Sequence, residues 1–157
     1  MFTPSRERIE CLSQPKRLPG GAFALENLIG IPYKFKGRGF DGVDCLGLVW
    51  LYFRSKGISF PDGDGLPIEE EAGPDYLKRA LDALNRIARP VSEPQADDIV
   101  VMRFPGGYVH LGVMVDQRNM LHVVKGRPSS VTPLWKFRFR IVGIYRLIAP
   151  NRGSAPP

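Results

Sequence analysis

The sequence has few residues of the kinds that build disulfides and metal sites. Its 157 residues include two cysteines, Cys11 and Cys45, and two histidines, His110 and His122. Two cysteines do not make a disulfide framework, and they cannot hold a zinc ion alone. The sequence therefore excludes a small disulfide-stapled fold, and its length is sufficient for one domain with its own apolar core.

Long apolar runs are also missing. No stretch is long enough to span a bilayer, and the first 21 residues lack the continuous apolar segment of a signal peptide. The contents of hydrophobic residues, 43%, and of charged residues, 24%, are those of an ordinary globular protein. We therefore expect a protein that is made in the cytoplasm and is not exported by the usual route.

Acidic residues are scarce toward the C-terminus. The net charge is +6, and from residue 100 onward the only acid is Asp116. Such a basic end could contact nucleic acid, an anionic wall polymer or an acidic protein, or it could be a solvated face. Because no nucleic-acid-binding motif accompanies the charge, the sequence favours the solvated face and predicts no nucleic-acid partner.

Helical patterns come first along the chain, and strand patterns follow. Apolar residues at helical spacing predict three helices, over 22–30, 45–57 and 74–89. The glycine-rich stretch between the first two helices is interpreted as a loop. After residue 90 the period changes to two and predicts four strands, over 98–104, 108–115, 120–125 and 137–148. Helices followed by strands indicate an α+β fold with an antiparallel sheet.

This pattern divides the chain into one domain and two flanking segments. Residues 1–21 end in a Pro-Gly-Gly cluster and are interpreted as an N-terminal arm. Residues 22–148 carry all the predicted elements and form the domain. Residues 149–157 are rich in proline and small residues, and we predict a disordered tail.

Two short motifs resemble ligand sites but lack the required context. Gly37, Gly39 and Gly42 match the pattern G-x-G-x-x-G. A dinucleotide site also requires a preceding parallel strand, which the sequence does not predict. The D-G-D-G stretch at 62–65 lacks the further oxygen ligands of a calcium loop, so we interpret it as a turn. The sequence thus predicts neither a nucleotide nor a metal site.

Cys45 is a better candidate for chemistry. It follows Asp44 and begins an apolar helical pattern. If Asp44 caps that helix, Cys45 lies in the first turn, where the helix dipole and free N–H groups stabilise a thiolate. The backbone N–H of Cys45 could also donate to an oxyanion that forms beside it. The alternative is that Cys45 is a small core residue.

A nucleophilic cysteine needs a base, and the histidines lie on two consecutive predicted strands. A three-residue loop over 116–118 would place His122 opposite Gly112, and therefore diagonal to His110 on the same face. A two-residue loop would place the two histidines on opposite faces. In the first case His110 could serve as general base and acid, with His122 orienting its ring.

Three stretches together resemble the NlpC family of papain-like cysteine peptidases. LIGIPYKFKGRGFDGVDCLGLVWLYF (28–53) is similar to its nucleophile segment, roughly G-x-P-Y-x-x-G-G…D-C-S-G-L-V. VHLGVMVDQRNMLHVV (109–124) is similar to its histidine hairpin, and ADDIVVMRF (96–104) to the G-D-L-V-F-F strand before it. The resemblance implies a papain-like fold, with the nucleophile at a helix start packed on the sheet that carries the histidines.

The resemblance also assigns roles to five residues. Cys45 matches the nucleophile, His110 the base, and His122 the third residue, which orients the base. Tyr33 matches the tyrosine whose hydroxyl helps to hold the oxyanion, and Asp44 matches the aspartate that shapes the substrate site. The resemblance thus implies a thiol peptidase with a Cys-His-His site and no metal or cofactor.

The chain departs from the family pattern at two positions. Leu46 stands where the family usually has serine, which removes a hydroxyl from the expected substrate side and affects the expected specificity rather than the thiol chemistry. Asp97 replaces the glycine of the G-D pair, which is expected to alter a turn.

Family members typically cut peptide bonds in the stem peptides of bacterial peptidoglycan. The chain is most similar to short members from phage tails and gene transfer agents. The resemblance therefore implies a tail-associated cell-wall endopeptidase, assembled into a virus-like particle with tail-tip or hub proteins, that helps particle entry. The basic C-terminal region and Leu46 motivate an alternative, a structural tail-tip component that keeps the fold without needing catalysis. A third possibility is a cytosolic peptide-recycling or acyl-transfer enzyme.

Overall fold

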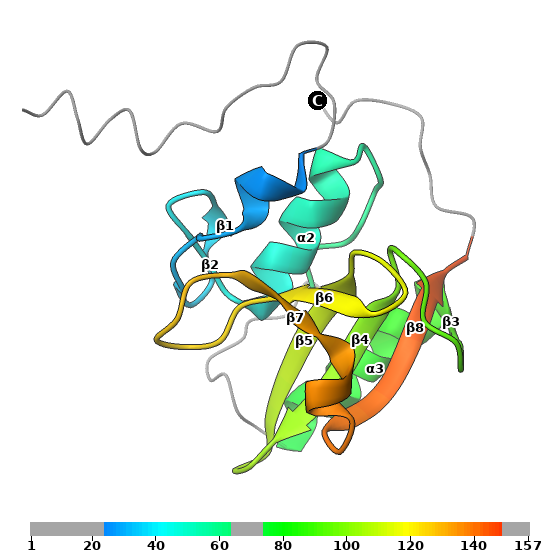
Figure 1. Ribbon diagram of the computed structural model, residues 1–157. Coiled ribbons are helices and arrows are strands. Elements are labelled where there is room, and N and C mark those ends of the chain that lie inside the picture. The colour runs from blue at the N-terminus through cyan, green and yellow to red at the C-terminus, as the bar shows by residue number, and fades with distance from the viewer. Residues whose placement is uncertain (1–23, 64–73, 149–157) are drawn as a thin grey trace, which may run out of the picture.

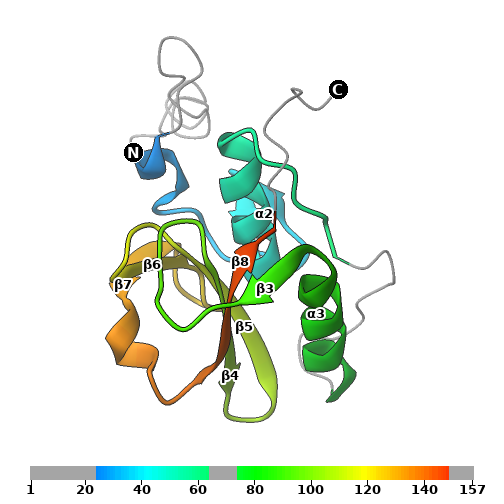
Figure 2. The ribbon, with the colours of Figure 1, turned by 90° about the vertical axis from the view of Figure 1, so that its right-hand side faces the viewer.

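The computed structural model describes residues 24–63 and 74–148. Six of its strands form one antiparallel sheet in the order β3-β8-β4-β5-β6-β7, and two further strands form a separate hairpin. Figures 1 and 2 show α2 and α3 on one side of the sheet, with β7 and η3 curling over the other side. This arrangement confirms the predicted α+β fold. The elements are η2 (Leu25–Leu28), β1 (Arg38–Gly39), β2 (Gly42–Val43), α2 (Cys45–Ser55), α3 (Pro74–Ile87), β3 (Ala88–Pro90), β4 (Ile99–Phe104), β5 (Tyr108–Met114), β6 (Asn119–His122), β7 (Ser130–Pro133), η3 (Leu134–Phe137) and β8 (Ile141–Leu147).

Helices α2 and α3 begin where the sequence predicts them, but they end at Ser55 and Ile87, two residues before the predicted ends at 57 and 89; the end of the second predicted helix is part of β3. Asp44 caps α2, and Gly57 follows it with a φ of +71°, a left-handed conformation that commonly ends a helix. Between these ends most of α2 is buried, and it packs against β5. Helix α3 begins at Pro74, which suits a first helical position because its missing N–H would have no partner there.

The sheet is buried on both faces along its central strands. One set of alternating residues belongs to the main core with α2, namely Ile99, Val101, Val109, Leu111 and Val113. The opposite set forms a second core, Val100, Met102, Met114 and Met120, against Leu134, Phe137 and Ile141. Burial of both faces explains why β4 and β5 are apolar at nearly every position.

Two aspartates tie the start of β4 to its surroundings. Asp97, at the glycine position of the family pattern, has a φ of +73°, a region that glycine occupies more easily. Its carboxylate accepts hydrogen bonds from the Tyr52 hydroxyl and from Lys56 Nζ, both at 2.6 Å. The neighbouring Asp98 is fully buried and forms an ion pair with Arg146 on β8 at 2.9 Å. Asp97 thus adopts a conformation that suits the glycine of the family pattern, and side-chain contacts hold the turn. The expected alteration of the turn stays a prediction.

The structure corrects several local predictions in the first half of the chain. The helix predicted over 22–30 is a 3-10 turn of four residues, Leu25–Leu28, and Gly30 follows with a φ of +88°. The stretch predicted as a loop contains the β1–β2 hairpin. A Cβ on Gly37 would collide with the carbonyl of Gly42, so only glycine permits this tight fold-back. The arm predicted over 1–21 and the tail over 149–157 lie outside the described residues.

Further corrections concern the strands. The strand predicted over 137–148 begins only at Ile141, because Arg140 N–H donates to the carbonyl of Phe137 and closes a turn. The strand predicted over 120–125 runs from Asn119 to His122. Strands β3 and β7 were not predicted. Each is short, lies at an edge of the sheet and ends at a proline, which edge strands tolerate.

Candidate active site

Cys45 is the first residue of α2, as the sequence predicts. The Asp44 side chain accepts a hydrogen bond from Gly47 N–H at 2.7 Å, which satisfies one of the free donors of the first turn. Cys45 is half-buried at the positive end of the helix dipole, an environment that favours a thiolate. A Cβ on Gly47 would collide with the carbonyl oxygen of Gly37, so this first turn lies directly against the β1–β2 hairpin.

The two histidines lie side by side, as the three-residue loop requires. Strands β5 and β6 pair Val113 with Leu121 and Met114 with Met120, and this register, extended by one residue, sets His122 opposite Gly112. Asp116 holds the loop by accepting hydrogen bonds from the N–H groups of Arg118 and Asn119, each at 2.7 Å. His110 Nε2 then lies 3.1 Å from His122 Nδ1. The predicted pairing of the histidines is confirmed.

A third side chain, which the sequence analysis missed, continues this chain of contacts. Thr132 Oγ1 on β7 lies 3.0 Å from His122 Nε2. Thr132 pairs with Met120 across the β6–β7 ladder, which places it diagonal to His122 on the same face. Since β7 was not recognised from the sequence, no local signal pointed to Thr132.

Two proton arrangements satisfy the hydrogen bonds between these three side chains. In one, His110 Nε2–H donates to His122 Nδ1, and His122 Nε2–H donates to the Thr132 oxygen. In the other, both bonds run the opposite way. Only the first leaves His110 Nδ1 with a free lone pair, and therefore able to accept a proton from a thiol.

Both rings are buried among apolar and aromatic neighbours. His110 lies edge-on to Phe104, and His122 lies edge-on to Phe137. Burial, with a smaller contribution from His122, lowers the pKa of His110 to about 3, and burial lowers the pKa of His122 to about 4. Both histidines are thus neutral near pH 7, the state in which His110 can act as a base.

One cleft of about 440 Å³ brings Cys45 and His110 together. His122 supports His110 from behind, whereas Tyr33 and Asp44 also line the cleft, so the predicted residues gather at one place. The other lining residues are Phe35, Phe104, Tyr108, Val109, Val123, Val124 and Lys125. The cleft thus contains a thiol and a neutral imidazole, and a second histidine holds that imidazole in place. These are the parts of a thiol-based acyl transfer site.

Leu46 does not take the substrate-side place expected of it. It is buried, belongs to the main core, and lines a separate apolar cavity of about 60 Å³ with Phe60, Leu84 and Ile99. Among the described residues that line the cleft, Leu46 is not present. The exchange of serine for leucine at this position therefore places an apolar side chain in the core beside the nucleophile.

Two negative findings apply to the described part of the chain. Within residues 24–63 and 74–148, no group of three or more histidine, cysteine, aspartate or glutamate side chains could hold a metal ion. No helix in these ranges is both long and apolar enough to cross a membrane.

Comparison with solved structures shows the same fold in several proteins. An NlpC/P60 family protein from Bacillus cereus ATCC 10987 is 22% identical with a TM-score of 0.56, over 79% of this chain and 40% of that chain. The NlpC/p60 domain of the peptidoglycan hydrolase SagA is 22% identical with a TM-score of 0.53, over 83% of this chain and 100% of that domain. NlpC2 from Trichomonas vaginalis is 15% identical with a TM-score of 0.57, over 78% of this chain and 44% of that chain. The chain thus spans less than half the length of the Bacillus and Trichomonas proteins.

Comparison of the sequence itself gives the family. A search of curated proteins found no match. The sequence model of the NlpC/P60 family, however, matches residues 30–139, a range that includes Tyr33, Cys45 and both histidines. Since this match covers more than half of the chain and the fold agrees with it, the protein belongs to the NlpC/P60 family, whose members are cysteine peptidases.

Proposed function

We propose that this protein is a cysteine endopeptidase that cleaves the stem peptides of peptidoglycan, with Cys45 as nucleophile and His110 as base. The observation that carries the proposal is the contact of 3.1 Å between His110 Nε2 and His122 Nδ1, on a cleft that also contains Cys45. It leaves Nδ1 as the nitrogen of His110 that can serve the thiol. The substrate class is supported by the family and by the likeness to the hydrolase domain of SagA.

The proposed reaction has two halves. His110 Nδ1 accepts the thiol proton, and Cys45 Sγ attacks the peptide carbonyl carbon. The oxyanion is held by the Cys45 N–H at the start of α2 and by the Tyr33 hydroxyl. The imidazolium gives its proton to the leaving amine as the C–N bond breaks. Water then hydrolyses the thioester with His110 again as base, which regenerates the thiol and releases a carboxylic acid.

Purified peptidoglycan provides the direct test. Wild-type protein is expected to release stem-peptide fragments, and Cys45→Ala is expected to release none, because the acyl enzyme cannot form. Cys11→Ser is the matched control, since it removes the other thiol of the chain. If Cys45→Ala released fragments at the wild-type rate, the proposal would be wrong.

We further propose that the protein is made in the cytoplasm and acts in the tail of a phage-like particle or gene transfer agent, beside tail-tip or hub proteins. The sequence resemblance to short tail-associated family members supports this setting. So does the surface of η3 and the following turn, where Trp135 is 62% exposed and Phe139 is 88% exposed, as at a site of protein contact.

Particles that carry Cys45→Ala separate this role from the structural alternative. For a tail peptidase we expect them to assemble and attach but fail to enter cells. Normal entry by these particles, together with loss of assembly when the chain is deleted, would favour the structural component instead.

A further inference from the structure

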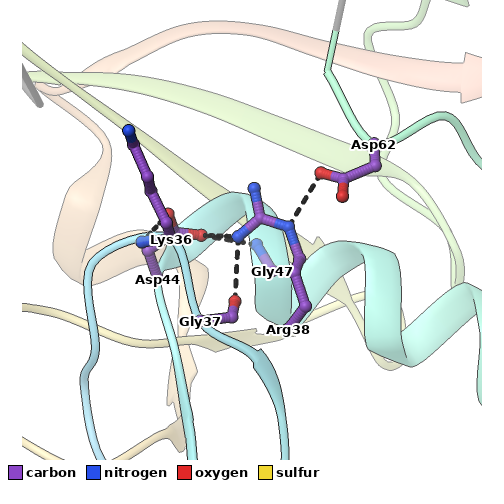
Figure 3. Close-up of polar contacts among 6 residues, drawn as sticks. All are labelled: Lys36, Gly37, Arg38, Asp44, Gly47 and Asp62. Carbon is purple, nitrogen blue, oxygen red and sulfur yellow. Dashed lines mark hydrogen bonds and ion pairs between the residues drawn. The ribbon is translucent and has the colours of Figure 1, made fainter. Parts of the chain in front are cut away.

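The carboxylate of Asp44 is fully engaged by the protein itself. Oδ1 accepts hydrogen bonds from Gly47 N–H at 2.7 Å and from Arg38 Nη1 at 2.8 Å, and Oδ2 accepts one from Lys36 N–H at 3.0 Å (Figure 3). The side chain is 12% exposed. Lys36 has a φ of +61°, the left-handed turn from which its N–H points at the carboxylate. Asp44 thus joins the first turn of α2 to the β1–β2 hairpin.

Arg38 is held just as firmly. Besides Asp44, its Nη1 donates to the carbonyl of Gly37 at 2.8 Å, and its Nε donates to Asp62 Oδ1 at 2.7 Å (Figure 3). Its side chain is 22% exposed, whereas that of Asp62 is 48% exposed. The guanidinium stays protonated at any pH the fold tolerates, so its charge is permanent. The inner carboxylate of this Asp62–Arg38–Asp44 triad is the one that lines the cleft.

The remaining charge in the cleft has the opposite sign. Lys125 lines the cleft and is exposed, and it forms no ion pair with any carboxylate in the described part of the chain. Asp44 is thus paired with Arg38, whereas the cleft-lining Lys125 has no carboxylate partner in the described part of the chain. The triad as a whole keeps a net charge of −1, because one guanidinium serves two carboxylates, but its outer carboxylate, Asp62, is not among the described residues that line the cleft.

We propose that Arg38 is a specificity-determining residue: by offsetting the charge of Asp44, it reserves that carboxylate for the helix cap and makes the cleft prefer anionic or neutral groups over cationic ones. For substrates, the proposal rests on the proposed function. It predicts that the enzyme prefers stem-peptide segments with a carboxylate, or with no charge, beside the scissile bond. As a statement about the cleft it depends only on a thiol that small reagents can reach.

Reagents of similar size and different charge measure this preference directly. Iodoacetate is an anion, iodoacetamide is neutral and 2-bromoethylammonium is a cation, and all three alkylate a thiol. The ratio of two rates on one protein cancels changes in the reactivity of Cys45 itself. In Arg38→Gln the rate with iodoacetate, relative to iodoacetamide, is expected to fall about fivefold, the size expected for one unit charge several ångströms away in a partly exposed site. The relative rate of 2-bromoethylammonium is expected to rise by a similar factor.

Two control variants separate the effect of the Arg38 charge from the effect of a structural change. Every protein in this experiment also carries Cys11→Ser. Arg38→Lys keeps the charge but loses the forked hydrogen bonds, so its rate ratios are expected to stay within about twofold of wild type. Arg89→Gln makes the same change of net charge on the exposed far edge of the sheet and is expected to leave the ratios unchanged. Unchanged ratios in a folded Arg38→Gln protein would overturn the proposal.

Asp44→Asn tests the same pair from the other side, in case Arg38→Gln does not fold. The asparagine oxygen can still cap α2, but Arg38 is no longer offset on the cleft side, so the relative rate of iodoacetate is expected to rise. An unchanged ratio in this variant also refutes the proposal. Because the alkylation ratios need no peptidase activity, a shift in them without any cleavage of peptidoglycan would leave the Arg38 proposal standing and refute the proposed function.

Discussion

The contact between His122 and Thr132 predicts a sharp effect of one isosteric substitution. Thr132→Val replaces the hydroxyl with a methyl group of similar size and leaves the buried His122 Nε2–H without its acceptor at 3.0 Å. Loss of one such hydrogen bond costs about 1 kcal/mol. If this energy is spent on holding the productive proton arrangement of His110, the rate of peptide cleavage falls about fivefold.

The assay compares kcat/KM for a stem peptide and the pH dependence of Cys45 alkylation in Thr132→Val, Thr132→Ser, His122→Ala and the double variant His122→Ala/Thr132→Val. Thr132→Ser keeps the hydroxyl and is expected to retain most of the activity. In a His122→Ala background, Thr132→Val is expected to have no further effect, because Thr132 acts through His122. Additive losses in the double variant would refute the reasoning and show that Thr132 influences the site by another route.

Two further predictions concern stability. Both buried histidines have lowered pKa values, about 3 for His110 and about 4 for His122, so between these values and about 6.5 the unfolded chain binds more protons than the folded one. The free energy of unfolding should therefore fall as the pH decreases from about 6.5 toward 4. Urea unfolding of His122→Gln should show a weaker dependence of this free energy on pH. If the free energy of unfolding of the wild type did not change with pH in this range, the burial argument would be contradicted. Gly47→Ala should lower the free energy of unfolding by about 1–3 kcal/mol, because the new Cβ collides with the Gly37 carbonyl; a wild-type urea midpoint would show that the hairpin moves aside without cost.

The sequence predicts those parts of the fold that depend on local patterns. Helix α2 has a cap at Asp44, an apolar stripe and a terminal glycine at Gly57, and each signal is local. The pairing of the histidines could be predicted only as a condition on the loop length, because a three-residue loop brings them to one face and a two-residue loop does not. Asp116 is well suited to close the three-residue loop that the structure has.

The missed parts depend on contacts between distant segments. The sequence of strand β7 does not alternate between polar and apolar residues, and the strand forms because it pairs with β6. The sequence therefore indicated no position for Thr132 in the sheet. Arg38 belongs to a glycine-rich stretch whose fold-back is set by packing on α2, and nothing in its neighbourhood indicates Asp44 and Asp62 as partners. The alternating arginines and phenylalanines near residue 138 have the pattern of a strand, but they do not form one. Phe137 packs against the second core, whereas Phe139 is exposed to solvent.

The order of the site along the chain has a consequence for its synthesis. Cys45 lies before the segment that joins the two described ranges, and His110, His122 and Thr132 all lie after it. During translation the thiol therefore leaves the ribosome well before any imidazole exists to accept its proton. In the proposed mechanism, the reactive site therefore arises only when the sheet has closed against α2. The alkylation rate of Cys45 during folding is therefore expected to report that final step.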